Sequence, residues 1–221
     1  MNKENLKKYL ESYKTYFSSR IEDNERVYNN INKLLKFENK QQILKDTCLL
    51  DLGSGDKSFY KVCLEKGVKA EEVDGSQGIN FETDKLSYDN ESFDFVFFNA
   101  VIEHIYNPGN ILTEIYRVLR TNGKLIVIAP NFRYSFRNFY DDPTHVHPYT
   151  PESLEAVMKM NNFKGTNVYP FLINKSLLLW KIPFKFFIAS IIPFRNHTFK
   201  KLPIPNLIRG KSTSMISISE K

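Results

Sequence analysis

The sequence predicts an α/β domain in which a mostly parallel sheet of seven strands carries helices on both faces. Short apolar segments alternate with amphipathic ones along the chain, an order typical of parallel strands joined by helices. Two of these segments, 92–99 and 124–130, are almost continuously apolar, which indicates strands buried on both faces. The 221 residues, 42% of them hydrophobic, suffice for one such domain with a sizeable core.

The expected elements follow in chain order. Strands are predicted at 47–52, 69–74, 79–81 (weak), 92–99, 124–130, 165–171 and 212–220. Helices are predicted within 5–37, as two helices broken near 22–24, and at 57–66, 107–121 and 150–163. The last of these has Thr150 as its N-cap and Pro151 at its first position. This organisation divides the chain into N-terminal helices (1–42), a core (43–170), a basic aromatic insertion (171–211) that could serve as a lid or contact a membrane surface, and a final strand (212–221).

The cellular setting is read from cysteine usage and from the absence of targeting patterns. Cys48 and Cys63 indicate neither a disulfide framework nor a metal site. The first residues lack the apolar stretch of a signal peptide, and the apolar stretch "FFIASIIPF" is far too short to span a bilayer. We therefore expect a cytoplasmic protein.

Positive charge is concentrated in the C-terminal part of the chain. Residues 156–219 contain no Asp or Glu and ten Lys or Arg, so the rest of the chain carries −4 of the total formal charge of +6. Within 171–211 the cations alternate with aromatic residues, a composition suited to an anionic membrane surface at the inner face of the membrane. The alternative is that the aromatic residues pack on the sheet or on a second subunit while the lysines point outward.

The stretch "LLDLGSGDKSF" (49–59) reads as a strand, a glycine turn and the start of a helix. It lacks the Walker spacing for a triphosphate, and Ser58 stands where a dinucleotide turn has its third glycine. A nucleoside without phosphate needs an acid before the first glycine and another after the next strand. Asp51 and Asp74 meet these needs, and Asp74 follows Gly55 by 19 residues.

The combined motifs resemble those of class I S-adenosylmethionine-dependent methyltransferases. "LLDLGSG" resembles their glycine motif, "EEVDGS" the end of their second strand, and "ESFDFVFFNAVIEH" with "RVLRTNGKLIVIAPN" the span from the fourth to the fifth strand. "DPTHVHPYTPESLEAVMKMNNF" resembles a segment of the branch that contains glycan and small-molecule O-methyltransferases. The resemblance covers about residues 45–170 and the final strand, and it implies a Rossmann-like, doubly wound fold with S-adenosylmethionine as cofactor.

The resemblance also assigns the cofactor-binding residues. The backbone of Gly53, Ser54 and Gly55 would border the methionine and ribose, Asp51 would meet the ammonium group, and Asp74 with Gly75 would take the ribose hydroxyls. Glu82 or Asp84 would accept from the adenine amine, and the alternative for Asp84, as for Asp89 and Glu91, is a solvated loop. Asn99 would line the methyl donor. These assignments in full are Asp51, Gly53, Ser54, Gly55, Asp74, Gly75, Glu82, Asp84 and Asn99.

Three histidines are the candidate catalytic groups, because a hydroxyl acceptor must lose a proton and imidazole titrates near neutral pH. His104 follows the fourth strand, close to the donor, where its alternative role is to anchor the loop. His145 and His147 flank one residue and could bind a divalent metal together with Asp141 and Asp142. That spacing is not diagnostic, and Asp-Pro is an ordinary turn former, so no metal is assigned.

The acceptor is expected to be a sugar or glycan precursor of the cell envelope. The alternatives are a lipid or a quinone-like metabolite and, outside enzymology, a cofactor-binding subunit. Nucleic acid is disfavoured, since "NAVI" replaces the tetrapeptide of base-amine methyltransferases and neither cysteine lies where C5 methylation of cytosine needs one. The sequence leaves the oligomeric state open.

Overall fold

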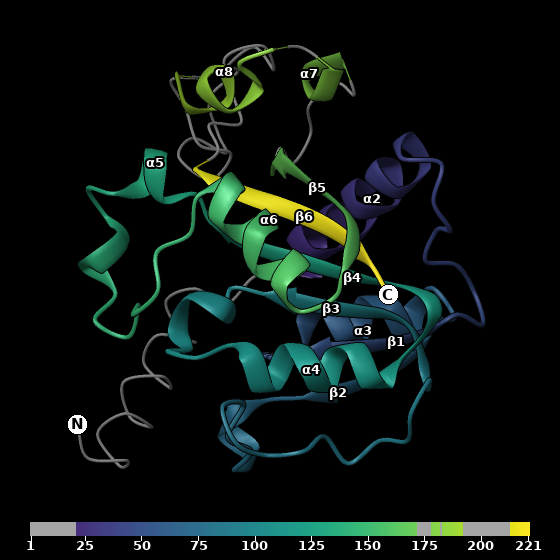
Figure 1. Ribbon diagram of the computed structural model, residues 1–221. Coiled ribbons are helices and arrows are strands. Elements are labelled where there is room, and N and C mark those ends of the chain that lie inside the picture. Colours follow the sequence, from purple (N-terminus) through teal and green to yellow (C-terminus); the bar gives the residue numbers. More distant parts are fainter. Residues whose placement is uncertain (1–20, 172–177, 182, 192–212) are drawn as a thin grey trace.

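The computed structural model describes residues 21–171, 178–181, 183–191 and 213–221. These residues form a single sheet of six strands, drawn in Figure 1. In chain order the strands are β1 (Cys48–Leu52), β2 (Lys69–Val73), β3 (Phe93–Asn99), β4 (Leu119–Pro130), β5 (Lys164–Pro170) and β6 (Ser214–Glu220). Their order across the sheet is β2-β1-β3-β4-β6-β5. The strands from β2 to β4 pair in parallel, whereas β6 lies antiparallel to both of its neighbours.

Helices and short helical turns join the strands. The longer helices are α2 (Ile21–Phe37), α3 (Ser58–Glu65), α4 (Gly109–Val118) and α6 (Pro151–Met160). The shorter ones are α5 (Phe132–Ser135), α7 (Leu178–Lys181) and α8 (Lys185–Ile191), with the 3-10 turns η1 (Gly75–Gln77), η2 (Ile102–His104) and η3 (Phe139–Asp141). None of the helices within the described ranges is long and apolar enough to cross a membrane.

The core has two layers, one on each face of the sheet. Because side chains alternate along a strand, Phe95 and Phe97 of β3 face α2 and α3, while Val96 and Phe98 face α4 and α6. The rings of Phe59 on α3 and Phe97 lie 4.0 Å apart between their centroids. In Figure 1, α4 and α6 lie in front of the sheet and α2 and α3 behind it. The prediction of helices on both faces is therefore confirmed.

Two predictions about individual elements are wrong. The described residues form six strands and not seven, because 79–81 is a turn that the Asp84 carboxylate closes by accepting from the Asn80 amide (2.8 Å). The predicted helix break near 22–24 lies inside α2, which runs from Ile21 to Phe37. Residues 22–24 are thus helical and do not interrupt α2. Residues 5–20 of the same prediction lie outside the described residues.

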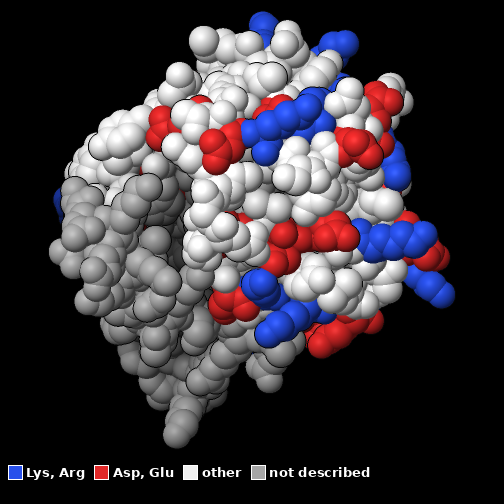
Figure 2. All heavy atoms as spheres, turned by 90° about the horizontal axis from the view of Figure 1, so that it is seen from below, with Lys and Arg blue, Asp and Glu red and all other residues white. Residues whose placement is uncertain are grey.

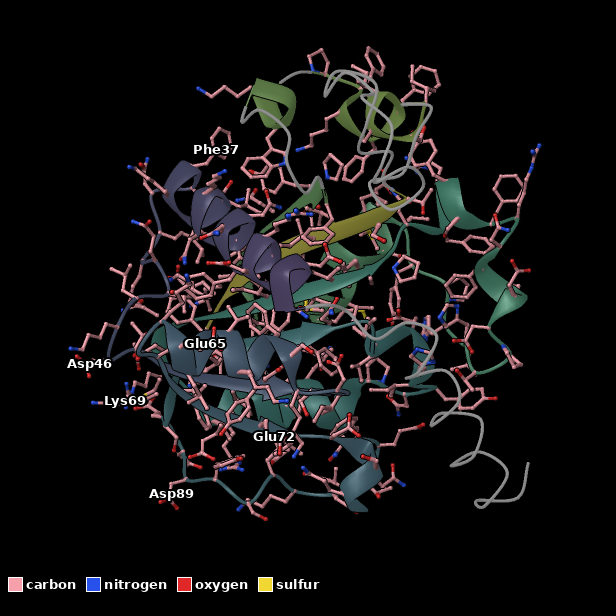
Figure 3. The ribbon with its side chains drawn as sticks, turned by 180° about the vertical axis from the view of Figure 1, so that it is seen from behind. Phe37, Asp46, Glu65, Lys69, Glu72 and Asp89 are labelled. Atoms are coloured by element: carbon pink, nitrogen blue, oxygen red, sulfur yellow. The ribbon has the colours of Figure 1, made fainter. Side chains whose placement is uncertain are left out.

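The described parts of the 171–211 segment contact the end of α2. The Trp180 ring lies 5.7 Å from the ring of Phe37, which Figure 3 places at the end of α2. The Lys185 ammonium lies 4.0 Å from the centroid of the Tyr169 ring. Trp180 is buried in the core, whereas Phe187 and Ile191 of α8 are more than half exposed. This segment thus packs on the sheet layer through one side and presents aromatic and aliphatic groups to solvent on another.

Helix α6 begins as predicted, with a reciprocal cap. The Ser153 amide donates to the Thr150 hydroxyl (3.3 Å), and the Thr150 amide donates to the Ser153 hydroxyl (2.8 Å). We expect Thr150→Ala to lower the free energy of unfolding by about 1 kcal/mol, because it leaves an amide of the first turn unsatisfied. Urea denaturation measures this change. Glu155→Ala, at an exposed position of the same helix, is the control and should change stability by less than about 0.5 kcal/mol.

Candidate functional site

The carboxyl ends of β1 and β3 form the point at which the strand order changes direction. From β1 the chain continues to β2 on one side, while β3 and β4 lie on the other side. In open parallel sheets, ligands bind outside the strand ends at such a point. The glycine turn follows β1, Asp74 follows β2, and Asn99 ends β3. The predicted cofactor residues therefore come from adjacent strand ends.

The glycine turn has a backbone that only glycine adopts without strain. Gly53 has a φ of +80°, and a Cβ placed on it would lie 2.2 Å from Val101 Cγ2 in the loop after β3. Gly55 has a φ of +54°, and a Cβ there would meet nothing within 4 Å. The Gly53 amide donates to the Val73 carbonyl (2.6 Å), which ties the turn to the end of β2. The turn is thus packed tightly at its first glycine and open at its second.

Glu72 of β2, labelled in Figure 3, binds side chains of this turn. It was not among the site residues predicted from the sequence. Its carboxylate accepts from the Ser54 hydroxyl (2.6 Å), the Lys57 ammonium (2.6 Å) and the Gln77 amide (3.0 Å). Burial acts to raise the pKa of Glu72, but the hydrogen bonds from Lys57 and Ser54 outweigh it and lower that pKa. The only feature of the sequence that could have indicated a role for Glu72 in the site was its position two residues before Asp74. Ser54 is buried and contributes its hydroxyl to this network rather than to open space.

Asp74 is the N-cap of η1 and joins it to the glycine turn. One oxygen accepts from the Gly55 amide (3.0 Å), and the other accepts from the Ser76 amide (2.9 Å) and the Ser76 hydroxyl (2.5 Å). A carboxylate has about four lone-pair sites, so it can accept further bonds from hydroxyl groups. Gly75 opens η1 directly beside it and is exposed.

Asp51 is the buried acid beneath the turn. Its side chain is 3% exposed, and its Oδ2 has no hydrogen-bond partner among the described residues. Burial is the largest effect on its pKa and raises it to about 7, with the nearby acids Glu72 and Asp56 adding to the rise and the Tyr60 amide opposing it. The Asp51 carboxylate oxygen without a donor among the described residues, close in sequence to a glycine turn with free space at Gly55, fits a ligand that carries a cationic hydrogen-bond donor. The residues present therefore fit S-adenosylmethionine, whose ammonium group would neutralise this carboxylate.

The two candidate adenine acids are both engaged in loop contacts. The Glu82 carboxylate accepts from the Tyr106 and Asn107 amides (3.3 Å each), and so joins its loop to the segment after η2. The Asp84 carboxylate accepts from the Asn80 amide and the Thr83 hydroxyl (2.9 Å). Asn99 is exposed at the end of β3. The prediction for the adenine acid stays open between Glu82 and Asp84.

The segment after β3 carries a second polar group, held by the loop that follows β4. The amides of Val146 (2.9 Å) and His147 (3.0 Å) both donate to the Glu103 carbonyl in η2. This pair of bonds brings His145 against His104, with ring centroids 4.7 Å apart. His147 instead stacks on the Tyr149 ring at 4.5 Å. Of the three candidate catalytic histidines, the fold thus brings two into contact and directs the third to an aromatic neighbour.

Hydrogen bonds orient both contacting imidazoles. His104 Nδ1 lies 2.8 Å from the Thr144 hydroxyl, which in turn donates to Asp142 Oδ1 (2.6 Å). His145 Nδ1 lies 2.5 Å from the Phe139 carbonyl. Burial and the neighbouring His145 lower the pKa of His104, and Asp142 acts in the opposite direction. Asp141 lies outside this group and bonds to Asn138 (3.0 Å).

Glu103 completes this group, and the sequence analysis did not name it as a site residue. Its side chain is 1% exposed, and burial, followed by the charge of Asp142, raises its pKa to about 8 against an opposing backbone hydrogen bond. Its Oε2 has no hydrogen-bond partner in the described part of the chain. The available signal was its position in "IEH", directly before a histidine.

Comparison with known proteins places the chain in a family. Residues 15–168 match the profile of a family described as "Methyltransferase domain", which is more than half of the chain. The chain therefore belongs to this methyltransferase family. An uncharacterized protein of Methanocaldococcus jannaschii is 31% identical over 128 residues, which are 54% of this chain and 58% of that protein. The chain spans less than two thirds of the length of the curated relatives that it matches.

Solved structures share the fold. A SAM-dependent methyltransferase from Archaeoglobus fulgidus has a TM-score of 0.59 at 19% identity, covering 95% of this chain and 98% of that one. A Haemonchus contortus phosphoethanolamine N-methyltransferase, in complex with phosphomonomethylethanolamine and S-adenosylhomocysteine, has a TM-score of 0.53 at 17% identity, covering 87% and 52%. The mixed α/β, Rossmann-like methyltransferase fold predicted from the sequence is thus confirmed.

The buried Asp51 gives the unliganded protein a specific pH dependence. Its folded-state pKa of about 7 exceeds the ordinary value of 3.8, so the folded protein binds more protons than the unfolded chain between these values. The free energy of unfolding should therefore fall as pH rises through this window. Asp51→Asn removes the effect and keeps an acceptor for the Tyr60 amide. At pH 8 we expect the variant to be more stable than the wild type by about 1–4 kcal/mol.

Urea denaturation at pH 4, 6 and 8 measures this difference. The two proteins should be close in stability at pH 4 and diverge as the pH rises. Parallel curves over the whole range would show that ionisation of Asp51 does not destabilise the fold.

Proposed function

We propose that this chain is an S-adenosylmethionine-dependent methyltransferase that methylates a hydroxyl group of a sugar or glycan precursor of the cell envelope. The observation that carries the donor half of this proposal is the unpartnered, buried Asp51 carboxylate beneath an open glycine turn. The acceptor half is supported by the contacting pair His104 and His145, because a hydroxyl acceptor must lose a proton and an imidazole can accept it.

The donor-binding roles follow from the strand ends. Asp51 would hold the ammonium group, the Gly53–Gly55 backbone would border the methionine and ribose, and Asp74 would accept from the ribose hydroxyls with its remaining lone pairs. Asn99 would lie beside the reacting methyl group. When bound, the cofactor supplies an electrophilic methyl group on a sulfonium. The protein then needs to align the acceptor and exclude water.

The acceptor would reach the donor past η2, where His104 and His145 lie. Nδ1 donates its proton to the Thr144 hydroxyl in His104 and to the Phe139 carbonyl in His145, so Nε2 of each ring keeps a lone pair. That lone pair would act on the hydroxyl, either by accepting its proton or by holding a group that acidifies it. His147, stacked on Tyr149, would position the acceptor at the edge of this group.

Charge on the visible surface agrees with a small-molecule or glycan acceptor. On the face shown in Figure 2, the acidic and basic side chains of the described residues are interspersed and form no continuous basic surface of the kind that binds nucleic acid. The exposed Phe187 and Ile191 of α8 support a contact between the 171–211 segment and the inner face of the membrane, where a lipid-linked precursor would be presented.

Incubation with labelled S-adenosylmethionine and fractionated cell envelopes tests the acceptor. We expect label in carbohydrate after mild lipid extraction, and less of it with Asp74→Ala when the cofactor concentration is limiting. Label that partitions into the lipid extract without sugar would favour a lipid or quinone-like acceptor and contradict the glycan proposal. Absence of cofactor binding by calorimetry would instead indicate a subunit without catalytic activity.

Asp74 should contribute directly to cofactor affinity. We expect Asp74→Ala to weaken S-adenosylhomocysteine binding by about 1–3 kcal/mol, because a half-buried hydrogen-bond acceptor is lost and Gly55 and Ser76 lose their partner. Isothermal titration calorimetry measures the effect. Asp89→Ala, at an exposed acid in another loop, serves as the control with unchanged affinity. An equal dissociation constant for wild type and Asp74→Ala would show that the ribose lies elsewhere.

A further inference from the structure

We propose that Glu103, His104 and His145 form a binding site for one divalent transition cation of the zinc class. One ligand atom from each residue lies within 4.8 Å of the other two. The three residues come from two segments, η2 and the loop after η3, that are separated by about 40 residues. The amides of Val146 and His147 hold these segments together by donating to the Glu103 carbonyl.

The tautomer that their partners impose suits both histidines to metal binding. The Phe139 carbonyl can only accept, so His145 Nδ1 carries the proton and Nε2 keeps its lone pair. The Thr144 hydroxyl donates to Asp142, so it accepts from His104 Nδ1, and His104 Nε2 is likewise left with a lone pair. A bond from the second ring nitrogen to a carbonyl or hydroxyl oxygen is the usual support of a metal-ligating histidine.

Glu103 supplies an independent observation. Its side chain is 1% exposed, yet its Oε2 has no hydrogen-bond partner among the residues that the structure describes. A buried carboxylate oxygen without a donor is costly, since buried polar groups are almost always paired. Asp142 Oδ2, 3.9 Å from His145 Nε2, adds a second acidic group at the same place. A bound cation would compensate the negative charge of both carboxylates, Glu103 and Asp142.

The donor set selects the kind of cation. Two imidazole nitrogens and one carboxylate oxygen suit Zn²⁺, Co²⁺ or Fe²⁺, whereas Mg²⁺ and Ca²⁺ prefer oxygen ligands. Bonds of about 2.0–2.1 Å to a tetrahedral Zn²⁺ place the ligand atoms roughly 3.4 Å apart. Separations of up to 4.8 Å must therefore shorten by up to about 1.4 Å on binding, through rotation of the three side chains. Three protein ligands leave a fourth position open.

The open coordination position gives the cation a role in the reaction, and this role rests on the proposed function. A hydroxyl bound to such a cation becomes more acidic, as metal-bound water does. The cation would then lower the pKa of the acceptor hydroxyl. The cofactor would still be bound by Asp51, Gly53, Gly55 and Asp74. Cation binding itself does not depend on the acceptor or on the cofactor.

Calorimetry on the chelator-treated full chain tests the site, with Zn²⁺ as the probe and Mg²⁺ as the comparison. We expect one equivalent of Zn²⁺ per chain and weak or no binding of Mg²⁺. Glu103→Gln and His145→Ala should each weaken Zn²⁺ binding at least about tenfold, and His147→Ala, outside the cluster, should not. X-ray absorption of the wild-type Zn²⁺ complex should show nitrogen and oxygen ligands and no sulfur, which separates this site from the two cysteines.

The same samples distinguish the two proposals. S-adenosylhomocysteine binding without Zn²⁺ binding would overturn the cation site alone, and the reverse result would overturn the proposed function alone. Unchanged Zn²⁺ affinity in both Glu103→Gln and His145→Ala, or a sulfur ligand in the absorption spectrum, would also overturn the site. Circular dichroism identifies a variant that does not fold, and the wild-type absorption spectrum then decides the ligand set.

Discussion

The close approach of Gly53 to Val101 is the contact on which the site depends. No side chain fits at residue 53, because its Cβ would lie 2.2 Å from Val101 Cγ2, and the backbone there has positive φ. This contact seats the turn after β1 against the segment after β3. That segment continues directly into η2, so the position of Glu103 and His104 follows from the same packing. The glycine turn and η2 with Glu103 and His104 are therefore positioned by one contact, and the loop after η3 adds His145 through its bonds to the Glu103 carbonyl.

Local patterns were enough to predict much of the fold and to place the candidate cofactor residues at the strand ends. The glycine turn, Asp51 and Asp74 are close in sequence to strands whose apolar runs are unmistakable, and parallel strands bring their carboxyl ends to one edge. The cap at Thr150 was legible because its hydrogen bonds span only three residues. These features depend on short-range chemistry, and a single sequence contains that chemistry in full.

Features set by distant contacts were missed for a physical reason. Glu103 reads as an ordinary surface acid until the loop around His145 is placed over it, and Glu72 reads as a strand residue until Ser54, Lys57 and Gln77 converge on it. The strand predicted at 79–81 has a suitable composition, but Asp84 bends its backbone into a turn. The deciding bonds come from backbone amides of another loop at Glu103, from side chains of three other segments at Glu72, and from a carboxylate four residues further on at Asn80.

The place of β6 in the sheet has a consequence for how the chain acquires its structure during synthesis. This strand is the last of the described strands to be made, yet it lies between β4 and β5 and provides the sheet contacts of β5. While the ribosome is still adding residues 171–213, one edge of β4 and all of β5 lack their partners. Such unpaired edges are prone to join other chains. During this period the strands from β2 to β4 can pair with one another, while the outer edge of β4 and the whole of β5 are without a partner strand.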